Sequence, residues 1–441
     1  MSHARPACYR VEPGGAVSGT LTVPGDKSIS HRALMLGAIA EGTTDVSGFL
    51  AGEDCLATAR ALAALGVTIE GLGSPQVRVH GVGGEGLRAA AAPLDLGNAG
   101  TAMRLMMGLL APQRFASTLV GDSSLMRRPM ERVAVPLRLM GAQITTVEGR
   151  PPVQIQGTPQ LRAIHYELPV ASAQVKSAIL LAALGADGRT RITEPAPSRD
   201  HTERMLGAFG VELLHEGRTI ALEGGQPLRA TQVAVPADFS SAAFFIVAGC
   251  LAATQPLLIT NVGINPTRTG LIDMLQRMGA DIRLHTRTAS GAPGAEPVAD
   301  IEVRASALHG ITVPEALVPL AIDEFPVFFI AAACASGETV VRGAHELRVK
   351  ESDRLAATAA GLTVLGVEHQ LLSDGLWLRG GATLGGGRID SRGDHRIAMA
   401  FAIAAPKARA PLVIDDVANV ATSFPGFVGT ARASGLQIQE L

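Results

Sequence analysis

The sequence predicts an α/β fold built from six similar units in two domains, and three observations support this. One pattern, an amphipathic helix followed by a glycine and a strand, occurs six times along the chain. Each unit also has an earlier helix that is apolar on every side, as is typical of a helix inside a core. The length of 441 residues suffices for two cores, because single cores stop growing near roughly 250 to 300 residues.

The six amphipathic helices share their sequence pattern and end at a glycine, the residue expected to cap a helix in the left-handed conformation. The segments are "RALAALGVTI", "PLRLMGAQI", "RMLGAFGVEL", "MLQRMGADI", "GLTVLGVEH" and "GTARASGLQI". Their glycines are Gly66, Gly141, Gly210, Gly279, Gly366 and Gly435. The spacing of about 70 residues indicates one repeated unit, and chance similarity among alanine- and glycine-rich helices is the alternative.

The six apolar helices are expected to fill the interior. They are "RALMLGAIA", "AMRLMMGLLA", "KSAILLAAL", "AAFFIVAGCLAA", "FFIAAACAS" and "IAMAFAIAA". The fourth belongs to an uncharged stretch, residues 239–267, that approaches the length of a membrane span. Because Gln255, Pro256, Asn261 and Asn265 interrupt this stretch, we expect a buried helix of about a dozen residues followed by a strand, with no membrane partner.

Composition excludes several partners. The net charge of −2 and an aromatic content of 3% supply neither a basic field nor stacking rings, so we expect no nucleic-acid partner. The N-terminal segment lacks the apolar stretch of a signal peptide, and Arg5 and Arg10 interrupt it, which favours a cytoplasmic location.

The four cysteines are scattered and never approach the spacing of a thiolate metal site, which indicates a reducing compartment. They are Cys8, Cys55, Cys250 and Cys334. We expect Cys250 and Cys334 to behave as small buried hydrophobic residues.

The residues before each apolar helix carry the functional signal. They read "GDKSISHR", "GNAGTAMR", "SAQVKS", "DFSS", "DEFP" and "GDHR". A helix start already offers free N–H groups and a positive dipole end, so added lysine and arginine there make sense if an anion binds. The candidate cations are Lys27, Arg32, Arg104, Arg128, Lys176, Arg199, Lys350, Arg354 and Arg396.

Polar side chains near these cations would orient a polyol, so a small substrate with several phosphates or carboxylates fits the set. They are Ser28, Asn98, Thr101, Ser172 and Gln174. For Arg32, Arg104 and Lys176, an equal alternative is that the side chain is solvated or pairs with a carboxylate at the edge of the core. Three histidines, His31, His201 and His395, lack partners at metal-ligand spacing, which favours hydrogen bonding or packing over a metal.

Several longer motifs, taken together, resemble the 5-enolpyruvylshikimate-3-phosphate synthase family. They are "PGDKSISHRAL", "LGNAGTAMR", "GDSSLMRRPM", "SAQVKSAILLA", "RVKESDR" and "GDHRIAMAF", and they cover the chain from about residue 20 to 430 in the family's order. Three further segments, "RDHTE", "SAQVK" and "NPTR", are similar to the second of the family's two main sequence classes.

The resemblance implies a two-domain inside-out α/β barrel with three βαβαββ units in each domain. One domain would hold residues 26–237 and the other residues 1–25 and 238–441, with the active site in the cleft between them. The implied reaction transfers the enolpyruvyl group of phosphoenolpyruvate to the 5-hydroxyl of shikimate 3-phosphate and releases phosphate. We expect a monomer that needs neither a cofactor nor a metal.

The family match also implies which residues bind each substrate. Shikimate 3-phosphate would be held by Lys27, Ser28, Arg32, Ser172, Ala173, Gln174, Arg199, Asp323 and Lys350. Phosphoenolpyruvate would be held by Lys27, Asn98, Gly100, Thr101, Arg128, Gln174, Arg354 and Arg396. Glyphosate would occupy the phosphoenolpyruvate site, where Gly100 leaves room that a methyl group would fill.

The implied chemistry is addition followed by elimination, which requires a base for the hydroxyl proton and an acid for the methylene carbon. Asp323 in "AIDEFP" aligns with the family's base, and Glu351 in "VKES" aligns with the residue that handles the methylene proton. Lys27 would assist proton transfer. The alternatives are that Asp323 only caps a helix and that Glu351 only pairs with Arg354. For Asp238, a cap, a hinge and a ligand contact remain open.

Three positions depart from the other main sequence class of the family. Thr422 stands where that class has a lysine, Ala173 where it has a serine and Glu346 where it has an asparagine.

Two other functions are considered. UDP-N-acetylglucosamine enolpyruvyl transferase would share the fold, but its loop cysteine has no counterpart in residues 121–130. A repeat-built protein that only binds phosphorylated metabolites is the other. Asp323 and Glu351 among the cations argue against it, because carboxylates weaken the binding of anions.

Overall fold

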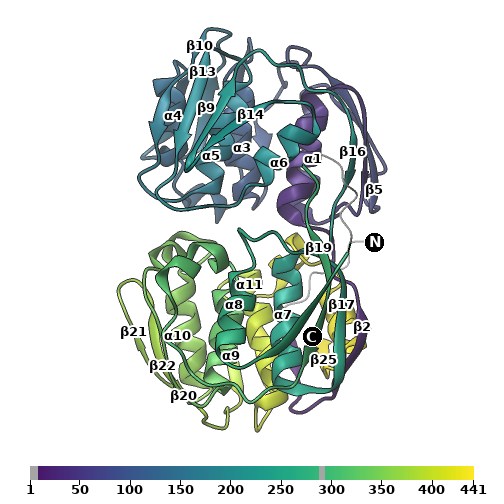
Figure 1. Cartoon of the computed structure of the whole chain (residues 1–441), viewed down its shortest axis with the longest axis vertical. Helices are drawn as coiled ribbons and strands as arrows, with labels where there is room; N and C mark the ends of the chain where they lie inside the picture. Colours follow the sequence, from purple (N-terminus) through teal and green to yellow (C-terminus); the bar gives the residue numbers. More distant parts are fainter. Residues whose placement is uncertain (1–7, 288–293) are drawn as a thin grey trace. The chain divides into compact units, whose positions relative to one another are not determined.

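The computed structural model describes residues 8–287 and 294–441, and the chain divides into two compact units (Figure 1). The central unit comprises Gly25–Val235 and Ala289–Glu296, and the terminal unit comprises Met1–Pro24, Pro236–Thr288 and Pro297–Leu441. The sequence-based boundaries differ from these by one or two residues and lack the segment Ala289–Glu296. Residues 1–7, part of the segment expected not to be a signal peptide, lie outside the described residues.

Both units are built from one repeated arrangement of strands and helices. In five of the six repeats, a strand, a buried helix, a second strand and an amphipathic helix are followed by two more strands. In the second repeat of the terminal unit, isolated bridges take the place of the first strand. The second repeat of the central unit shows the pairing: β6 (Leu94–Asp95) lies parallel to β7 (Ala116–Val120), which pairs antiparallel with β9 (Arg150–Gln156). Strand β8 (Gln143–Val147) pairs antiparallel with β9, so the sheet order is first, second, fourth, third.

The central unit contains three such repeats. The first consists of α1 (Lys27–Ile39), β3 (Glu41–Ser47), α2 (Glu53–Ala64), β4 (Thr68–Glu70), β5 (Gln76–Val82) and β16 (Gln232–Ala234). The second adds α3 (Gly100–Leu110), η1 (Leu125–Arg127) and α4 (Glu131–Leu139) to its four strands. The third consists of β11 (His165–Glu167), α5 (Ala173–Ala183), β13 (Arg189–Thr193), α6 (His201–Ala208), β14 (Leu213–Glu216) and β15 (Thr219–Glu223). A separate pair is formed by β10 (Leu161–Arg162) and β12 (Ala186–Asp187).

The terminal unit contains three more repeats. The first consists of β2 (Val17–Leu21), α7 (Phe239–Ala252), β17 (Ala253–Gly263), α8 (Gly270–Arg277), β18 (Asp281–Thr286) and β19 (Val298–Arg304). The second consists of η2 (Glu315–Leu317), η3 (Pro319–Ala321), α9 (Phe325–Cys334), β20 (Gly337–Val341), η4 (His345–Val349), α10 (Arg354–Val364), β21 (Glu368–Leu371) and β22 (Leu376–Gly380). The third consists of β23 (Gly387–Asp390), α11 (His395–Ala404), η5 (Ala405–Lys407), β24 (Leu412–Asp415), η6 (Ala418–Thr422), α12 (Phe427–Ala433), β25 (Ile438–Glu440) and β1 (Cys8–Val11).

Three repeats are completed by strands from distant parts of the chain. In the first repeat of the terminal unit, β2 lies parallel to β17. In the central unit, β16 pairs parallel with β3 and supplies the first strand of the repeat that begins with α1. In the terminal unit, β1 lies between β24 and β25 and is antiparallel to both. The last strand of the central unit therefore completes the first repeat of that unit, and the N-terminal strand β1 belongs to the C-terminal repeat.

The structure confirms the sequence pattern that predicts the repeats. The six glycines after the amphipathic helices all have positive φ, from 72° at Gly366 to 103° at Gly141, as a left-handed cap requires. The uncharged stretch 239–267 begins with the buried helix α7 and continues as strand β17, as expected. In the described part of the chain, no helix combines the length and the apolar content that a membrane span needs.

Each unit has its own hydrophobic core, formed mainly by its three buried helices. In the terminal unit, α7, α9 and α11 pack against one another, and in the central unit α3 packs against α1 and α5 (Figure 1). Cys250 is buried as expected, whereas Cys334 at the end of α9 is only partly buried. Burial raises the pKa of both thiols to about 12, which keeps them protonated at neutral pH.

The contact between α3 and α5 depends on one glycine. A Cβ atom at Gly108 would lie 2.1 Å from the carbonyl oxygen of Ala178. Because that oxygen belongs to the backbone, a side chain at position 108 would force the two helices apart.

We therefore expect Gly108→Ala to lower the free energy of unfolding of the central unit by about 2 kcal/mol or more. The matched control is Gly207→Ala on α6, where an added Cβ meets nothing within 4 Å. This control is expected to change stability by less than about 1 kcal/mol. Urea unfolding followed by circular dichroism measures both, and equal midpoints for the two variants would contradict the close contact.

Candidate active site

The start of α1 combines a helix cap with an ion pair. Asp26 caps the helix by accepting a hydrogen bond from the backbone N–H of Ile29 at 2.9 Å. Lys27 is the first residue of α1, and its Nζ lies 3.0 Å from Oδ2 of Asp54 on α2. The Lys27 side chain keeps 16% of its surface exposed, so it is available to a ligand.

Arg32, one turn further along α1, is buried among hydroxyl groups. Its Nε donates to Thr202 at 2.7 Å, and its Nη2 donates to Ser177 at 2.9 Å. Its Nη1 donates to the carbonyl of the partly buried Ser28 at 3.0 Å. Burial lowers the pKa of Arg32 to about 10; the charge of Arg199, a partly buried residue before α6, acts in the same direction, and Glu203 opposes it. The charges of Arg32 and Arg199 therefore interact within the central unit, and Glu203 partly compensates the charge of Arg32.

Lys176 is a candidate cation that has a structural role in place of anion binding. Its Nζ contacts Glu194 at 2.8 Å and Glu203 at 2.7 Å, and only 1% of its side chain is exposed. Two buried carboxylates already compensate its charge, so Lys176 stabilises the base of α5 instead of awaiting an anion.

The start of α3 lies beside two arginines. Backbone N–H of Gly100, the first residue of α3, donates to the carbonyl of Asn98 at 2.9 Å. The Asn98 side-chain oxygen accepts from Nη2 of Arg128 at 2.5 Å. A Cβ atom at Gly100 would lie 2.7 Å from Nη1 of Arg128 and 3.4 Å from Nη1 of Arg104, so the glycine gives the guanidinium of Arg128 its room.

Gln174 connects the starts of α3 and α5. Its amide oxygen accepts from Nη1 of Arg104 at 2.6 Å, and its amide nitrogen donates to the hydroxyl of Thr101 at 2.9 Å. Ser172 caps α5 through Val175 at 3.5 Å, and Ala173 is the first residue of that helix. The central unit thus brings together the candidate residues of α3 and α5.

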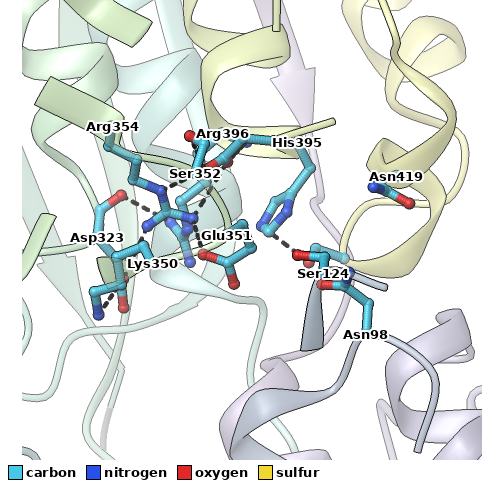
Figure 2. Close-up of polar contacts among 12 residues, drawn as sticks. Asn98, Ser124, Asp323, Lys350, Glu351, Ser352, Arg354, His395, Arg396 and Asn419 are labelled. Carbon is cyan, nitrogen blue, oxygen red and sulfur yellow. Dashed lines mark hydrogen bonds and ion pairs between the residues drawn. The ribbon is translucent and has the colours of Figure 1, made fainter. Parts of the chain in front are cut away.

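Arg354 is the centre of the site in the terminal unit (Figure 2). Its side chain is 1% exposed, and its Nε lies 2.8 Å from Asp394, the residue that caps α11. Its Nη1 contacts Asp323 at 3.2 Å, and its Nη2 contacts Glu351 at 2.6 Å. Burial by itself lowers the pKa of Arg354, but these three carboxylates outweigh burial and raise the pKa above its usual value.

Asp323 contacts two more cations of the terminal unit. Its Oδ1 lies 3.2 Å from Nζ of Lys350, and its backbone oxygen accepts from Nη1 of Arg396 at 3.0 Å. Burial lowers the pKa of the Lys350 ammonium, and the charge of Asp323 opposes this shift. Asp323 lies two residues before α9, and its side chain caps no helix: α9 has no side-chain cap. Figure 2 shows that Asp323, Lys350, Glu351 and Arg354 converge on one place.

Asp238 and Thr422 have local structural roles in the terminal unit. Asp238 caps α7 through Ser240 at 3.0 Å and pairs with the buried Arg268 at 2.9 Å, so the cap is the role that the structure gives it. The hydroxyl of the buried Thr422 donates to the carbonyl of Asn419 at 2.7 Å. Glu346 lies in η4, before Lys350.

A polar contact joins the starts of the two helices in every repeat. The six contacts are Lys27 to Asp54 at 3.0 Å, Asn98 to Arg128 at 2.5 Å, Lys176 to Glu203 at 2.7 Å, Asp238 to Arg268 at 2.9 Å, Asp323 to Arg354 at 3.2 Å and His395 to Ser423 at 3.1 Å. Five of the candidate site residues form these contacts: Lys27, Asn98, Arg128, Asp323 and Arg354. The repeat thus places polar groups at the start of each buried helix and holds them there.

Sequence reasoning missed several carboxylates of the site. Asp394 is visible in the motif "GDHR", but only its neighbour Arg396 was assigned a role. Asp54 lies in a helix that carries no motif of the family, whereas Glu203 is the last residue of "RDHTE" but has no role assigned from the sequence. The partner of each is 27 residues away along the chain. Two of these carboxylates carry a signal in the sequence: Asp394 stands at a helix cap position, and Glu203 stands in a quoted motif.

Asp200, His201 and Glu296 in the central unit place their ligand atoms within 4.8 Å of one another. Nδ1 of the buried His201 is hydrogen-bonded to Glu296 at 2.6 Å, and Asp200 pairs with Arg204 at 2.8 Å. His201 and Asp200 thus have partners within the protein that explain why these side chains lie together. That the protein needs no metal remains a prediction.

The described architecture and site motifs have known counterparts. A family model described as EPSP synthase (3-phosphoshikimate 1-carboxyvinyltransferase) matches residues 11–430. The chain belongs to the EPSP synthase family. It therefore has the two-domain inside-out α/β fold of that family.

Relatives match along nearly the whole chain. The chain is 56% identical over 438 residues to the 3-phosphoshikimate 1-carboxyvinyltransferase of Methylococcus capsulatus, covering 99% of each chain. It is 58% identical to that of Alkalilimnicola ehrlichii, covering 98% of this chain and 96% of the relative. A solved structure of EPSP synthase from Acinetobacter baumannii matches with a TM-score of 0.87 and 52% identity, covering 98% of this chain and 99% of that one.

His31 makes the stability of the central unit depend on pH. Burial, followed by the charges of Lys27 and Arg32, lowers its pKa from 6.5 to about 3, and its Nδ1 contacts the hydroxyl of Thr58 at 2.8 Å. Between pH 3 and 6.5 the unfolded chain binds a proton at this histidine that the folded chain does not bind. Protonation of this histidine therefore costs no stability above pH 6.5, and the free energy of unfolding falls as the pH is lowered through this window.

We expect His31→Asn to remove about 1 to 2 kcal/mol of the stability loss between pH 7 and pH 5. Urea unfolding at the two pH values measures the difference, with His215→Asn, a change of an exposed histidine in the same unit, as the matched control. If the loss in His31→Asn equals that of the unchanged protein, His31 is not the buried neutral group described here.

Proposed function

We propose that this chain transfers the enolpyruvyl group of phosphoenolpyruvate to the 5-hydroxyl of shikimate 3-phosphate and releases phosphate. This is the carboxyvinyl transfer that its relatives are named for, and it is a step in the synthesis of aromatic amino acids. The observation that carries the proposal is the cluster of Asp323, Lys350, Glu351 and Arg354 in a chain of this family. We further propose that the protein acts as a monomer in the cytoplasm, where its four free thiols are stable.

The two substrates are both anionic, which suits a site rich in lysine and arginine. We assign shikimate 3-phosphate mainly to the central unit. Its proposed contacts are Lys27, Ser28, Arg32, Ser172, Ala173, Gln174 and Arg199, with Asp323 and Lys350 from the terminal unit. We assign phosphoenolpyruvate to Lys27, Asn98, Gly100, Thr101, Arg128 and Gln174, with Arg354 and Arg396 from the terminal unit.

The proposed acid and base are Glu351 and Asp323. In the addition step, the 5-hydroxyl oxygen attacks the central carbon of phosphoenolpyruvate, Asp323 accepts the hydroxyl proton and Glu351 protonates the methylene carbon. In the elimination step, Glu351 takes a proton back from the methyl carbon, the carbon–oxygen bond to phosphate breaks and the phosphate leaves. Lys27 and the arginines stabilise the negative charge of the tetrahedral intermediate. Arg354 fixes both carboxylates, because it contacts Asp323 at 3.2 Å and Glu351 at 2.6 Å.

The two other functions lack support at the same residues. UDP-N-acetylglucosamine enolpyruvyl transferase places a cysteine in the loop that corresponds to residues 121–130, and this chain has none there. In a protein that only binds phosphorylated metabolites, Asp323 and Glu351 would lower the affinity for the ligand, since carboxylates repel anions.

An acceptor assay tests the proposed function. Phosphorus NMR follows phosphate release from phosphoenolpyruvate with shikimate 3-phosphate, with UDP-N-acetylglucosamine and with no acceptor. We expect release with shikimate 3-phosphate alone. We expect Asp323→Asn to lower kcat by about 100-fold to 10000-fold in this assay, with Glu315→Gln, at a position outside the proposed site, as the control. Activity of Asp323→Asn within a few-fold of the unchanged enzyme would remove Asp323 from the mechanism.

Gly100 yields a prediction about inhibition by glyphosate. A methyl group at this position would lie 2.7 Å from Nη1 of Arg128, so the guanidinium must shift and the proposed phosphoenolpyruvate site shrinks. We expect Gly100→Ala to raise the glyphosate inhibition constant by about tenfold or more, and to raise the KM for phosphoenolpyruvate by less. Steady-state kinetics measure both constants, and Gly207→Ala controls for a glycine replaced in open space. Equal inhibition constants for Gly100→Ala and the unchanged enzyme would defeat the assignment.

A further inference from the structure

A cavity lies in the central unit, at the C-terminal ends of the buried helices α1, α3 and α5. Its volume is about 450 Å³, within the range of small-molecule sites. Ile39 at the end of α1, Leu109 near the end of α3 and Leu181 near the end of α5 all line it. Because α1 has 13 residues, this cavity is about 20 Å along the helix from Lys27. It is therefore separate from the proposed active site.

The floor of the cavity is apolar. Ile39, Leu109, Leu181, Leu184 and Leu228 line it, and each has 9% or less of its surface exposed. These side chains come from three helices and from the segment before β16, so the floor belongs to the core and is formed in advance.

Hydrogen bonds also hold the walls in place. Nε2 of the buried Gln113 donates to the carbonyl oxygens of Gly84 at 3.2 Å and Leu109 at 3.3 Å. Backbone N–H of Gly225 donates to Leu184 at 2.8 Å. The loops that contain Gly84 and Gly225 are thus tied to the helix ends, and a ligand would not need to order them.

The charge of the cavity is negative. Three carboxylates line it, Glu41, Glu85 and Asp187, and no lysine or arginine is among the lining residues. Glu85 pairs with Arg114 at 3.4 Å, whereas Glu41 and Asp187 make no ion pair within the part of the chain that the structure describes. The three helices also point their negative dipole ends toward this region. The cavity therefore attracts cations and repels anions, the reverse of the proposed active site.

We propose that this cavity binds a compact organic monocation, an ammonium group carried on an aromatic or branched aliphatic body. The body would occupy the leucine and isoleucine floor, and the ammonium would face Glu41 and Asp187. An anionic or zwitterionic ligand of the same size would place a carboxylate near those two groups and bind more weakly.

Titration calorimetry with the full chain tests the proposal, using 2-phenylethylammonium and 3-phenylpropionate as probes of similar size and opposite charge. We expect saturable binding of the ammonium probe, and binding at least about tenfold weaker for the carboxylate probe. The double variant Glu41→Gln, Asp187→Asn should weaken binding of the ammonium by about fivefold. Glu167→Gln, an exposed carboxylate elsewhere in the same unit, is the control and should leave the affinity within twofold of the unchanged protein.

A steric variant tests the location separately. A Cβ atom at Gly84 meets nothing within 4 Å, so Gly84→Phe adds a ring at the wall with little strain. We expect it to abolish binding while the unfolding midpoint stays unchanged. No saturable binding of the ammonium, equal affinity for the two probes, or full affinity in either the double variant or Gly84→Phe would overturn the proposal. The measurement needs no turnover, so its outcome is independent of the proposed reaction.

Discussion

The contact of Arg354 with Asp394, Asp323 and Glu351 is the interaction on which the site of the terminal unit depends. Arg354 is almost fully buried at the first residue of a helix, where the dipole disfavours a cation. Three carboxylates offset the cost of a buried cation at this position, and the same guanidinium holds each of them in place. Removing one partner would leave a buried charge uncompensated. The contacts that orient the proposed base and acid therefore also stabilise the terminal unit.

The same constraint recurs in every repeat. Each buried helix begins near a polar side chain that contacts the start of the neighbouring helix, and the partners differ from one repeat to the next. In the repeat of Lys176 and Glu203, both partners are buried and neither is assigned a substrate contact, so there the contact stabilises the fold. Where a cation stays partly exposed, as Lys27 and Lys350 do, the contact is available for a ligand. One backbone arrangement thus provides both structural and candidate functional positions.

The sequence predicted the local features of this fold well. The capping glycines, the buried helices and the helix starts follow from patterns within ten or so residues, which local physical chemistry determines. The partners of the charged residues could not be predicted in this way. Lys176 appears equivalent to Lys27 in sequence, but Glu194 and Glu203 meet it only in the folded chain. The pairing of β1 with β24 and of β16 with β3 likewise joins segments at opposite ends of the units.

The central claim is that basic residues at these helix starts bind two anionic substrates around Asp323. A crystal structure of the enzyme with shikimate 3-phosphate and phosphoenolpyruvate tests it most directly. Our account predicts phosphate and carboxylate groups in contact with Lys27, Arg128, Arg354 and Arg396, and the 5-hydroxyl within hydrogen-bond distance of Asp323. Substrates bound away from these side chains, or a 5-hydroxyl facing another base, would contradict it.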